Sequence, residues 1–232
     1  MFPPPQSPPR VAVGQMFDRI AHRYDLLNRL LSFGRDVAWR KAMVRHLPEG
    51  RELRVLDLAT GTADVLLALH VTERVRFGVG LDLSGGMLQF AQKKTAGKPL
   101  ALVQGDGTRL GLREGTFDVV SIAFGIRNVV DVDAGLREMR RMLAPGGRAL
   151  ILEFSLPENR LFRALYLGYF RHVLPRIGGL LSGDSHAYRY LNQTVETFPY
   201  GVEFQNLMRA AGFSEVRALP LTMGIATLYV GE

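Results

Sequence analysis

Three acidic residues, each within or at the end of an apolar run, have the types and spacing best suited to chemistry in this chain. Asp57, Asp82 and Asp106 belong to the successive runs RVLDLAT (54–60), FGVGLDLS (77–84) and LALVQGD (100–106). Asp82 lies 21 residues after Gly61. At this spacing from a glycine turn, an acid that ends a second strand accepts the two hydroxyl hydrogens of a ribose. These residues predict a site for a ligand that contains a nucleoside.

The turn after the first run distinguishes among such ligands. It reads DLATGTAD (57–64), with a single glycine, whereas a dinucleotide requires closely spaced glycines beside its pyrophosphate. S-adenosylmethionine has no phosphate and carries a sulfonium cation, which carboxylates attract. We therefore predict an S-adenosylmethionine site with Asp57, Gly61, Asp82, Asp106 and Gly107 as cofactor-binding residues.

A second polar feature stands in AFGIRNVVD (123–131), directly after the apolar run TFDVVSI (116–122). Arg127 and Asn128 have apolar neighbours on both sides, and an arginine is seldom buried without a partner. A surface loop or a salt bridge is the simpler interpretation of a lone arginine. Taken without the rest of the chain, this segment leaves both interpretations open.

The apolar runs alternate with helical patterns, which indicates a parallel sheet covered by helices on both faces. Strands are expected at 54–60, 77–84, 100–106, 117–124 and 148–155. Helices are expected at 64–74, 85–97, 132–147 and 201–213, followed by two more strands in a hairpin. Ligands of such sheets bind beyond the carboxyl ends of the strands. Residues 156–200 interrupt the alternation, and we expect them to form a cap over that end.

Composition narrows the class of protein. The chain has 232 residues, of which 47% are hydrophobic, and no cysteine. No apolar run approaches the ~20 residues of a membrane span, and MFPPPQSPPR (1–10) lacks the apolar core of a secretion signal. We expect a cytoplasmic protein with no metal, a disordered Pro-rich tail at 1–14 and a single domain at 15–232.

The formal charge of +7 is unevenly distributed. Residues 1–54 carry +5 and residues 155–190 carry +3, and both segments are rich in Leu, Phe and Tyr. Basic and aromatic residues together are typical of proteins that contact RNA or an anionic membrane surface. Ordinary solvated helix faces have the same composition, so the charge alone does not select a partner.

Several segments resemble known families. DLATGTAD, GLDLSGGML, QGDGTRL and LAPGG, in this order, resemble class I S-adenosylmethionine-dependent methyltransferases. Three segments resemble the ubiquinone/menaquinone biosynthesis C-methyltransferases more specifically, and the resemblance covers about residues 15–230. They are MFDRIAHRYDLLNRLLSFGRDVAW (16–39), FGIRNVVD (124–131) and GDSHAYRYLNQTVETFP (183–199). Ala63, Asp36 and Ala123 depart from the family pattern, where Gly, His and Ser respectively are common.

The resemblance implies a Rossmann-like fold with a mostly parallel seven-stranded sheet, an N-terminal helical lid at 15–50 and a helical cap at 156–200. It implies methylation of a ring carbon of a polyprenylated quinol, with demethylmenaquinol favoured. Arg127 and Asn128 are the implied catalytic residues, and Tyr24, Asp25, Tyr188 and Tyr190 the implied substrate-binding residues. Thr62 is predicted at the amino acid end of the cofactor, or else as the N-cap of the first helix of the α/β alternation. The roles of His186 and Asp36 stay open.

The polyprenyl tail gives the basic, apolar flanks a purpose, because they can contact the inner face of an anionic membrane. Four alternatives stay open. The equivalent reaction of ubiquinone biosynthesis fits the same segments, and an inactive partner of a biosynthetic complex retains the cofactor fold. An RNA methyltransferase usually has Asn-Pro-Pro-aromatic where this chain has GIRN, so nucleic acid is not expected. A dinucleotide oxidoreductase lacks its glycines.

Overall fold

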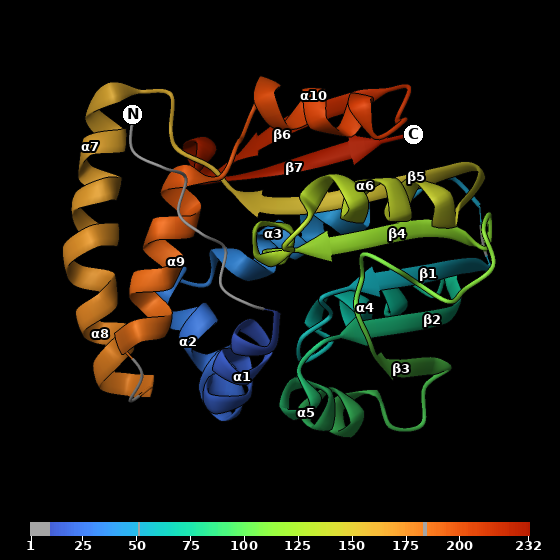
Figure 1. Cartoon of the computed structure of the whole chain (residues 1–232), viewed down its shortest axis with the longest axis horizontal. Helices are drawn as coiled ribbons and strands as arrows, with labels where there is room; N and C mark the ends of the chain where they lie inside the picture. The colour runs from blue at the N-terminus through green and yellow to red at the C-terminus, as the bar shows by residue number, and fades with distance from the viewer. Residues whose placement is uncertain (1–9, 51, 183–184) are drawn as a thin grey trace.

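Seven strands form one sheet in the order β3-β2-β1-β4-β5-β7-β6 (Figure 1). The computed structural model describes residues 10–50, 52–182 and 185–232. β7 is antiparallel to both of its neighbours, and the other pairings are parallel. The strands are β1 (Leu53–Leu58), β2 (Val75–Asp82), β3 (Leu100–Gln104), β4 (Phe117–Ala123), β5 (Leu143–Phe154), β6 (Val216–Leu221) and β7 (Ala226–Gly231). The alternation seen in the sequence correctly predicts this sheet and its terminal hairpin.

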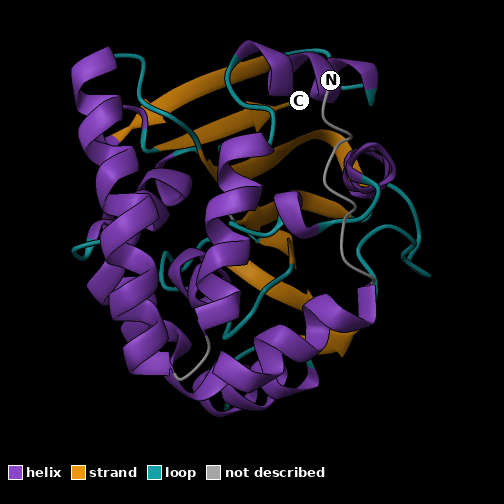
Figure 2. Cartoon of the chain, turned by 60° about the vertical axis from the view of Figure 1, so that its left-hand side comes forward, coloured by secondary structure: helices purple, strands orange, loops and turns teal. Residues whose placement is uncertain are grey.

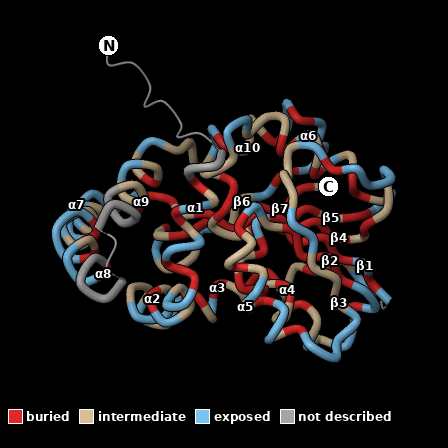
Figure 3. Tube along the Cα trace, turned by 60° about the horizontal axis from the view of Figure 1, so that its bottom comes forward, coloured by how far each residue is buried: buried red, intermediate tan, exposed pale blue. Residues whose placement is uncertain are grey.

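Helices cover both faces of the sheet because successive strand residues point to opposite sides. Leu56 and Val120 pair in register and pack under α6 (Val132–Met142) and α10 (Val202–Ala210). Their neighbours Val55 and Val119 pack on the opposite face. That face is covered by α3 (Arg35–Arg45), α4 (Asp64–His70) and α5 (Gly85–Thr95). Figure 3 shows the strands as the most continuously buried part of the chain.

A helical layer lies beyond the carboxyl ends of the parallel strands, on the left of Figure 1. Its N-terminal part is α1 (Arg10–Ile20), η1 (Ala21–Arg23) and α2 (Tyr24–Leu31). Its later part is α7 (Arg160–Gly168), η3 (Tyr169–Val173), α8 (Leu174–Ser182) and α9 (Ser185–Thr197). The two parts share a core that includes Ile20, Leu27, Tyr166, Phe170 and Val195. Figure 2 shows these helices side by side in front of the strand ends, so the lid and the cap form one cover.

Among the boundaries that differ from the sequence prediction, two have a clear physical reason. The tail predicted for 1–14 ends too late, because α1 begins at Arg10 and buries Val13, Met16 and Ile20 at helical spacing. The helix predicted for 132–147 ends at Met142, because Leu143 already pairs with Phe117 and starts β5. Within the described part of the chain, no helix is long and apolar enough to cross a membrane.

Candidate functional site

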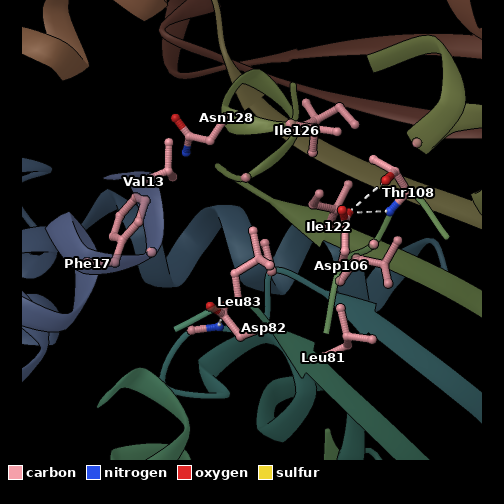
Figure 4. A pocket seen from close by; sticks show the side chains of 18 of the residues that line it. Val13, Phe17, Leu81, Asp82, Leu83, Asp106, Thr108, Ile122, Ile126 and Asn128 are labelled. Carbon is pink, nitrogen blue, oxygen red and sulfur yellow. Dashed lines mark hydrogen bonds between the residues drawn. The ribbon is translucent and has the colours of Figure 1, made fainter. Parts of the chain in front are cut away.

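Two cavities lie side by side between the strand ends and the helical cover. The first is lined from β1, β2, β4 and the loops that follow them (Figure 4). The second has a volume of about 410 Å³ and is lined mostly by the helical cover. Four residues line both cavities: Phe17, Tyr24, Phe124 and Asn128. A ligand in one cavity can therefore contact a ligand in the other.

The first cavity is built around the turn between β1 and α4. Gly61 has a φ of +56°, which an L side chain adopts only with strain, and its N–H donates to Asp82 Oδ2 at 2.7 Å. Asp82 Oδ1 accepts from the backbone N–H of Ser84 at 2.8 Å. These bonds fix the carboxylate at the end of β2, and burial raises its pKa. Gly61 and Asp82, which the sequence predicts to act together, therefore both line this cavity and are bonded to each other.

The opposite wall of this cavity comes from the loop after β3. Asp106, Gly107 and Thr108 line it, and Asp106 Oδ1 accepts from the N–H and the hydroxyl of Thr108 at 2.9 and 2.8 Å (Figure 4). No Lys or Arg is among the lining residues that the structure describes. Two carboxylates in the lining suit a cationic or zwitterionic nucleoside and disfavour a pyrophosphate. The donor set fits S-adenosylmethionine.

Asp57, also predicted to bind the cofactor, is buried behind the cavity and is absent from its lining. Its carboxylate accepts hydrogen bonds from Thr60 and Ser121, each at 2.6 Å. Burial raises its pKa to about 6, although both hydrogen bonds act in the opposite direction. The residue holds the end of β1, the following turn and β4 together.

This pKa makes stability depend on pH. The pKa of Asp57 in the folded protein lies above its ordinary value. The free energy of unfolding therefore falls as the pH rises from about 4 to about 6, because the buried carboxyl ionises less readily than in the unfolded chain, and the loss is complete above that range. We expect Asp57→Asn to gain about 2 kcal/mol relative to the wild type between pH 4 and pH 7. Urea unfolding of both proteins across this range measures the difference. A constant difference would show that Asp57 is charged at both pH values.

The second cavity is mainly aromatic. Trp39, Phe124 and Phe154 contact one another, with ring centroids 4.4 to 6.1 Å apart, and Trp39 Nε1 donates to Thr222 Oγ1 at 2.8 Å. Further rings come from both parts of the helical cover: Phe17, Tyr24, Phe33, Tyr166, Tyr169, Phe170 and Tyr190. Such a lining suits a flat apolar ring.

Arg127 brings a positive charge into this cavity. It lies in η2 (Ile126–Asn128), and its Nη1 donates to Glu153 Oε1 at 2.7 Å and to the carbonyl of Phe124 at 2.6 Å. Its side chain is 7% exposed and that of Glu153 is 2% exposed. The salt-bridge interpretation is therefore correct, and its partner ends the neighbouring strand β5.

Two polar atoms beside the boundary of the cavities lack a partner. Arg127 Nε and Asn128 Oδ1 are buried and form no hydrogen bond with any residue that the structure describes. The bonds from Nη1 to Glu153 and to the Phe124 carbonyl hold the guanidinium in place. In this position the N–H of Nε has no acceptor among the described residues. A buried polar atom without a partner costs about 1–3 kcal/mol, and a bound polar ligand removes that cost. Tyr24 lines the same region, and its burial raises the pKa of its hydroxyl.

Two other predicted site residues, Asp25 and Thr62, line neither cavity. Thr62 Oγ1 donates to Asp25 Oδ1 at 2.6 Å, and Lys94 pairs with Asp25 and with Asp64, the latter at 2.7 Å. This cluster ties α2 of the lid to α4 and α5. Thr62 is also not the N-cap of α4: that position is Ala63, which forms no side-chain cap.

The remaining predicted residues lie on α9 and α3. Tyr190 lines the second cavity, and burial raises its pKa. Tyr188 and His186 belong to α9, but their side chains lie outside the described part of the structure. Asp36, whose role the sequence left open, is buried and accepts from Arg40 of its own helix at 2.5 Å and from Arg29 of α2 at 3.3 Å, so it links α2 to α3. Among the described residues, no His, Asp or Glu cluster suits a metal ion.

Glu153 and Lys94 are the important residues that sequence reasoning missed. Glu153 had a signal, because a lone acid ends the apolar run RALILEFS (148–155), as Asp82 and Asp106 end theirs. Lys94 had none, because it lies in an ordinary amphipathic helix.

Comparisons with known proteins agree with this geometry. The model of the ubiE/COQ5 methyltransferase family matches residues 7–232. The ubiquinone/menaquinone biosynthesis C-methyltransferase UbiE of Syntrophotalea carbinolica is 52% identical, over 93% of this chain and 92% of that protein. The demethylmenaquinone methyltransferase of Thermus thermophilus is 46% identical, over 94% and 99%.

Solved structures extend the agreement to the fold. The putative methyltransferase in complex with the Haloferax volcanii Trm112 activator has a TM-score of 0.68 at 21% identity, over 93% of this chain and 96% of that chain. A Thermotoga maritima S-adenosylmethionine-dependent methyltransferase has a TM-score of 0.64 at 20% identity, over 94% and 98%. The predicted Rossmann-like methyltransferase fold is thereby confirmed.

Proposed function

Since this chain belongs to the ubiE/COQ5 methyltransferase family, we propose that it methylates a ring carbon of demethylmenaquinol, with S-adenosylmethionine as the methyl donor. One observation carries the proposal. A cavity with two carboxylates adjoins an aromatic cavity, and unpaired polar atoms of Arg127 and Asn128 lie where they meet. The first suits a sulfonium nucleoside, and the second suits a quinol ring.

In the first cavity, Asp82 accepts hydrogen bonds from the ribose hydroxyls, and the loop of Asp106 and Gly107 holds the base. Gly61 allows the backbone to approach the cofactor closely. Asp57 and Thr62 act as positioning residues, because the structure has both side chains bonded to the protein outside the cavity lining. When bound, S-adenosylmethionine supplies an electrophilic methyl carbon on a sulfonium.

In the second cavity, the aromatic walls and Tyr190 would hold the ring, and Tyr24, which lines both cavities, would contact both ligands. The transfer forms a bond between the methyl carbon and the ring carbon and breaks the carbon–sulfur bond. S-adenosylhomocysteine is released. The phenolic proton leaves to solvent when the ring ionises, and the proton of the ring carbon returns to that oxygen when aromaticity is restored. Holding the two carbons at about 3–3.5 Å supplies much of the rate. With both ligands bound, the helical cover and the ligands would exclude water, which strengthens the polar contacts at the reacting centre.

Arg127 and Asn128 act on the phenolic oxygen beside the reacting carbon. Ionisation of the phenol makes the ring carbon a better nucleophile, and a donor fixed beside the oxygen stabilises the charge that develops. Glu153 balances the charge of Arg127, so we assign Arg127 the role of a fixed hydrogen-bond donor through Nε. Asn128 Oδ1 accepts the hydrogen of a ring hydroxyl and orients the ring.

The substrate within the class is inferred from the relatives. The proteins of Thermus thermophilus and Deinococcus radiodurans, at 46% and 45% identity, are named demethylmenaquinone methyltransferases. The first relative above is named for both ubiquinone and menaquinone, so the ubiquinone precursor is the second candidate. Because a polyprenylated quinol resides in a bilayer, we also propose cytoplasmic location with peripheral contact to an anionic membrane.

Methyl transfer in solution tests this function. We expect the protein to convert chemically reduced demethylmenaquinone to the methylated quinol, with one S-adenosylhomocysteine released per product, and to leave the oxidised quinone unchanged. Mass spectrometry of the quinol identifies the methylated carbon. If the protein methylated only the ubiquinone precursor, that quinol would be the substrate in place of demethylmenaquinol. Methylation of RNA instead of either quinol would overturn the proposal.

A further inference from the structure

The second cavity opens at the turn between α2 and α3. Among its lining residues, Phe33 and Arg35 are exposed to solvent, and Phe33 is 77% exposed. The Phe33 ring packs beside Tyr169 of η3 at 5.6 Å between centroids, and the Tyr169 hydroxyl donates to the carbonyl of Leu31 at 3.2 Å. The opening therefore lies where the turn meets η3.

An exposed apolar stripe leads to this opening. Leu26 and Leu30 lie one turn apart on α2 and are 66% and 49% exposed, and Phe33 follows directly. Leu27, on the opposite face of the same helix, is buried in the core of the helical cover. The two leucine pairs of YDLLNRLL thus give α2 two apolar faces, of which the outer one has no partner among the described residues.

The other side of the opening is also apolar. Val173 follows Tyr169 by one turn, and Ile177 follows Val173 on α8; both are exposed. α8 packs against α2, so the elements that carry these residues lie beside the helix that carries the stripe. We name Leu26, Leu30, Phe33, Val173 and Ile177 the mouth rim.

The segments that carry the mouth rim are strongly basic. Residues 160–182 contain four arginines and no acidic residue. Residues 23–35 contain Arg23, Arg29 and Arg35 against the single acid Asp25, which pairs with Lys94. Two of the arginines have acidic partners outside these segments: Arg29 pairs with Asp36, and Arg171 with Glu196. Exposed apolar side chains on arginine-rich helices are typical of surfaces that insert shallowly between anionic lipid headgroups.

We propose that the mouth rim docks on an anionic lipid bilayer so that the second cavity opens directly into the hydrocarbon region. This rests on the proposed function, because it assumes a substrate with a long polyprenyl tail. A cavity of about 410 Å³ is of the size that encloses one drug-sized molecule. It holds the ring and the start of the tail, and the rest of the tail stays in the bilayer. Docking in this orientation lets the ring enter the site without extraction of the whole lipid into water.

The test uses a double variant, Leu26→Glu with Leu30→Glu. Both residues are exposed and line neither cavity, so the fold and the site stay intact. The matched control is Val71→Glu with Val202→Glu, because these residues are also exposed, at 74% and 68%, and lie outside the helical cover. Co-sedimentation with vesicles of phosphatidylglycerol and phosphatidylcholine measures binding.

We expect the wild type and the control to bind these vesicles with an affinity that falls as salt rises, because basic residues contribute through charge. The mouth-rim variant is expected to bind at least about tenfold more weakly, since it loses two apolar side chains and gains two negative charges. Equal binding by all three proteins would overturn the proposal. So would a loss of dimers in the variant with vesicle binding unchanged, because the stripe would then cover a second copy of the chain.

Activity separates this proposal from the proposed function. With a water-soluble quinol that has one isoprene unit, we expect the same kcat and KM for the wild type and the mouth-rim variant. With a long-tailed quinol in vesicles, we expect the variant to show a several-fold higher apparent KM. If the wild type failed to methylate either quinol, the proposed function would fail while the vesicle measurement still decided the docking surface. A loss of activity on the soluble quinol would show that the stripe belongs to the site.

Discussion

Arg127→Ala is expected to lower kcat for methyl transfer by about 10²–10³-fold, the usual effect of removing one fixed donor from a developing oxyanion. The KM of S-adenosylmethionine should change little, because Arg127 lines the second cavity and not the first. The variant should also unfold more easily by about 3–5 kcal/mol, because Glu153 is left buried and unpaired. Single-turnover kinetics and urea unfolding measure the two effects separately.

A second variant separates catalysis from folding. Arg127→Met with Glu153→Gln removes both charges and keeps a side-chain oxygen for the backbone N–H of Phe154, which donates to Glu153 Oε1 at 2.8 Å. We expect this pair to recover most of the lost stability, since apolar replacement of a buried ion pair is often close to neutral. Its activity should stay low. Recovery of activity together with stability would show that Arg127 only supports the fold.

The sequence predicts the sheet and the first cavity well because both depend on local rules. A parallel strand buried on both faces is a short apolar run, and its carboxyl end faces the ligand in every such sheet. The positions of Gly61, Asp82 and Asp106 in the cavity lining follow from those two facts. None of them requires knowledge of a contact between distant segments.

The second cavity depends on pairings that local rules do not predict. Arg127 and Glu153 meet because β4 and β5 are neighbours in the sheet, and the sequence does not show that their ends coincide. Asp25 looks like a substrate ligand within RYDLLN, but Thr62 and Lys94 occupy its carboxylate. The partners of Asp25, Thr62 and Lys94 depend on how the lid packs on α4 and α5, and this packing is visible only in the folded chain.

The two cavities also differ in the electrostatic conditions that they present. The first places the Asp82 and Asp106 carboxylates beside a sulfonium ligand, without a nearby lysine or arginine in its described lining. The second presents Arg127 already balanced by Glu153. The fixed positive charge that an ionised phenol would meet is therefore smaller than the sequence suggests, and the sulfonium of a methyl donor bound in the adjoining cavity would supply the nearest further cation. This arrangement couples ionisation of the ring to occupancy of the first cavity.

Asp82→Asn is expected to weaken binding of S-adenosylhomocysteine about 100-fold or more. The carboxylate loses its charge and one acceptor oxygen, and each hydrogen bond to a charged group contributes about 1.5–3 kcal/mol. The Gly61 N–H also loses its partner at 2.7 Å, so the turn that approaches the cofactor is less well held. Isothermal titration calorimetry with S-adenosylhomocysteine measures the affinity without any contribution from the quinol.

Asp118→Asn is the matched control for this variant. Asp118 lies near the start of β4, at the end of the sheet away from the cavities, and pairs on the surface with Arg54 at 3.1 Å. Its affinity for S-adenosylhomocysteine should stay within about twofold of the wild type. Burial raises the pKa of Asp82, so wild-type affinity should fall on acidification at a higher pH than for an ordinary aspartate, and this fall should be absent in Asp82→Asn. If Asp82→Asn bound as tightly as Asp118→Asn, another group would hold the ribose, and the spacing of 21 residues from Gly61 would have no functional meaning.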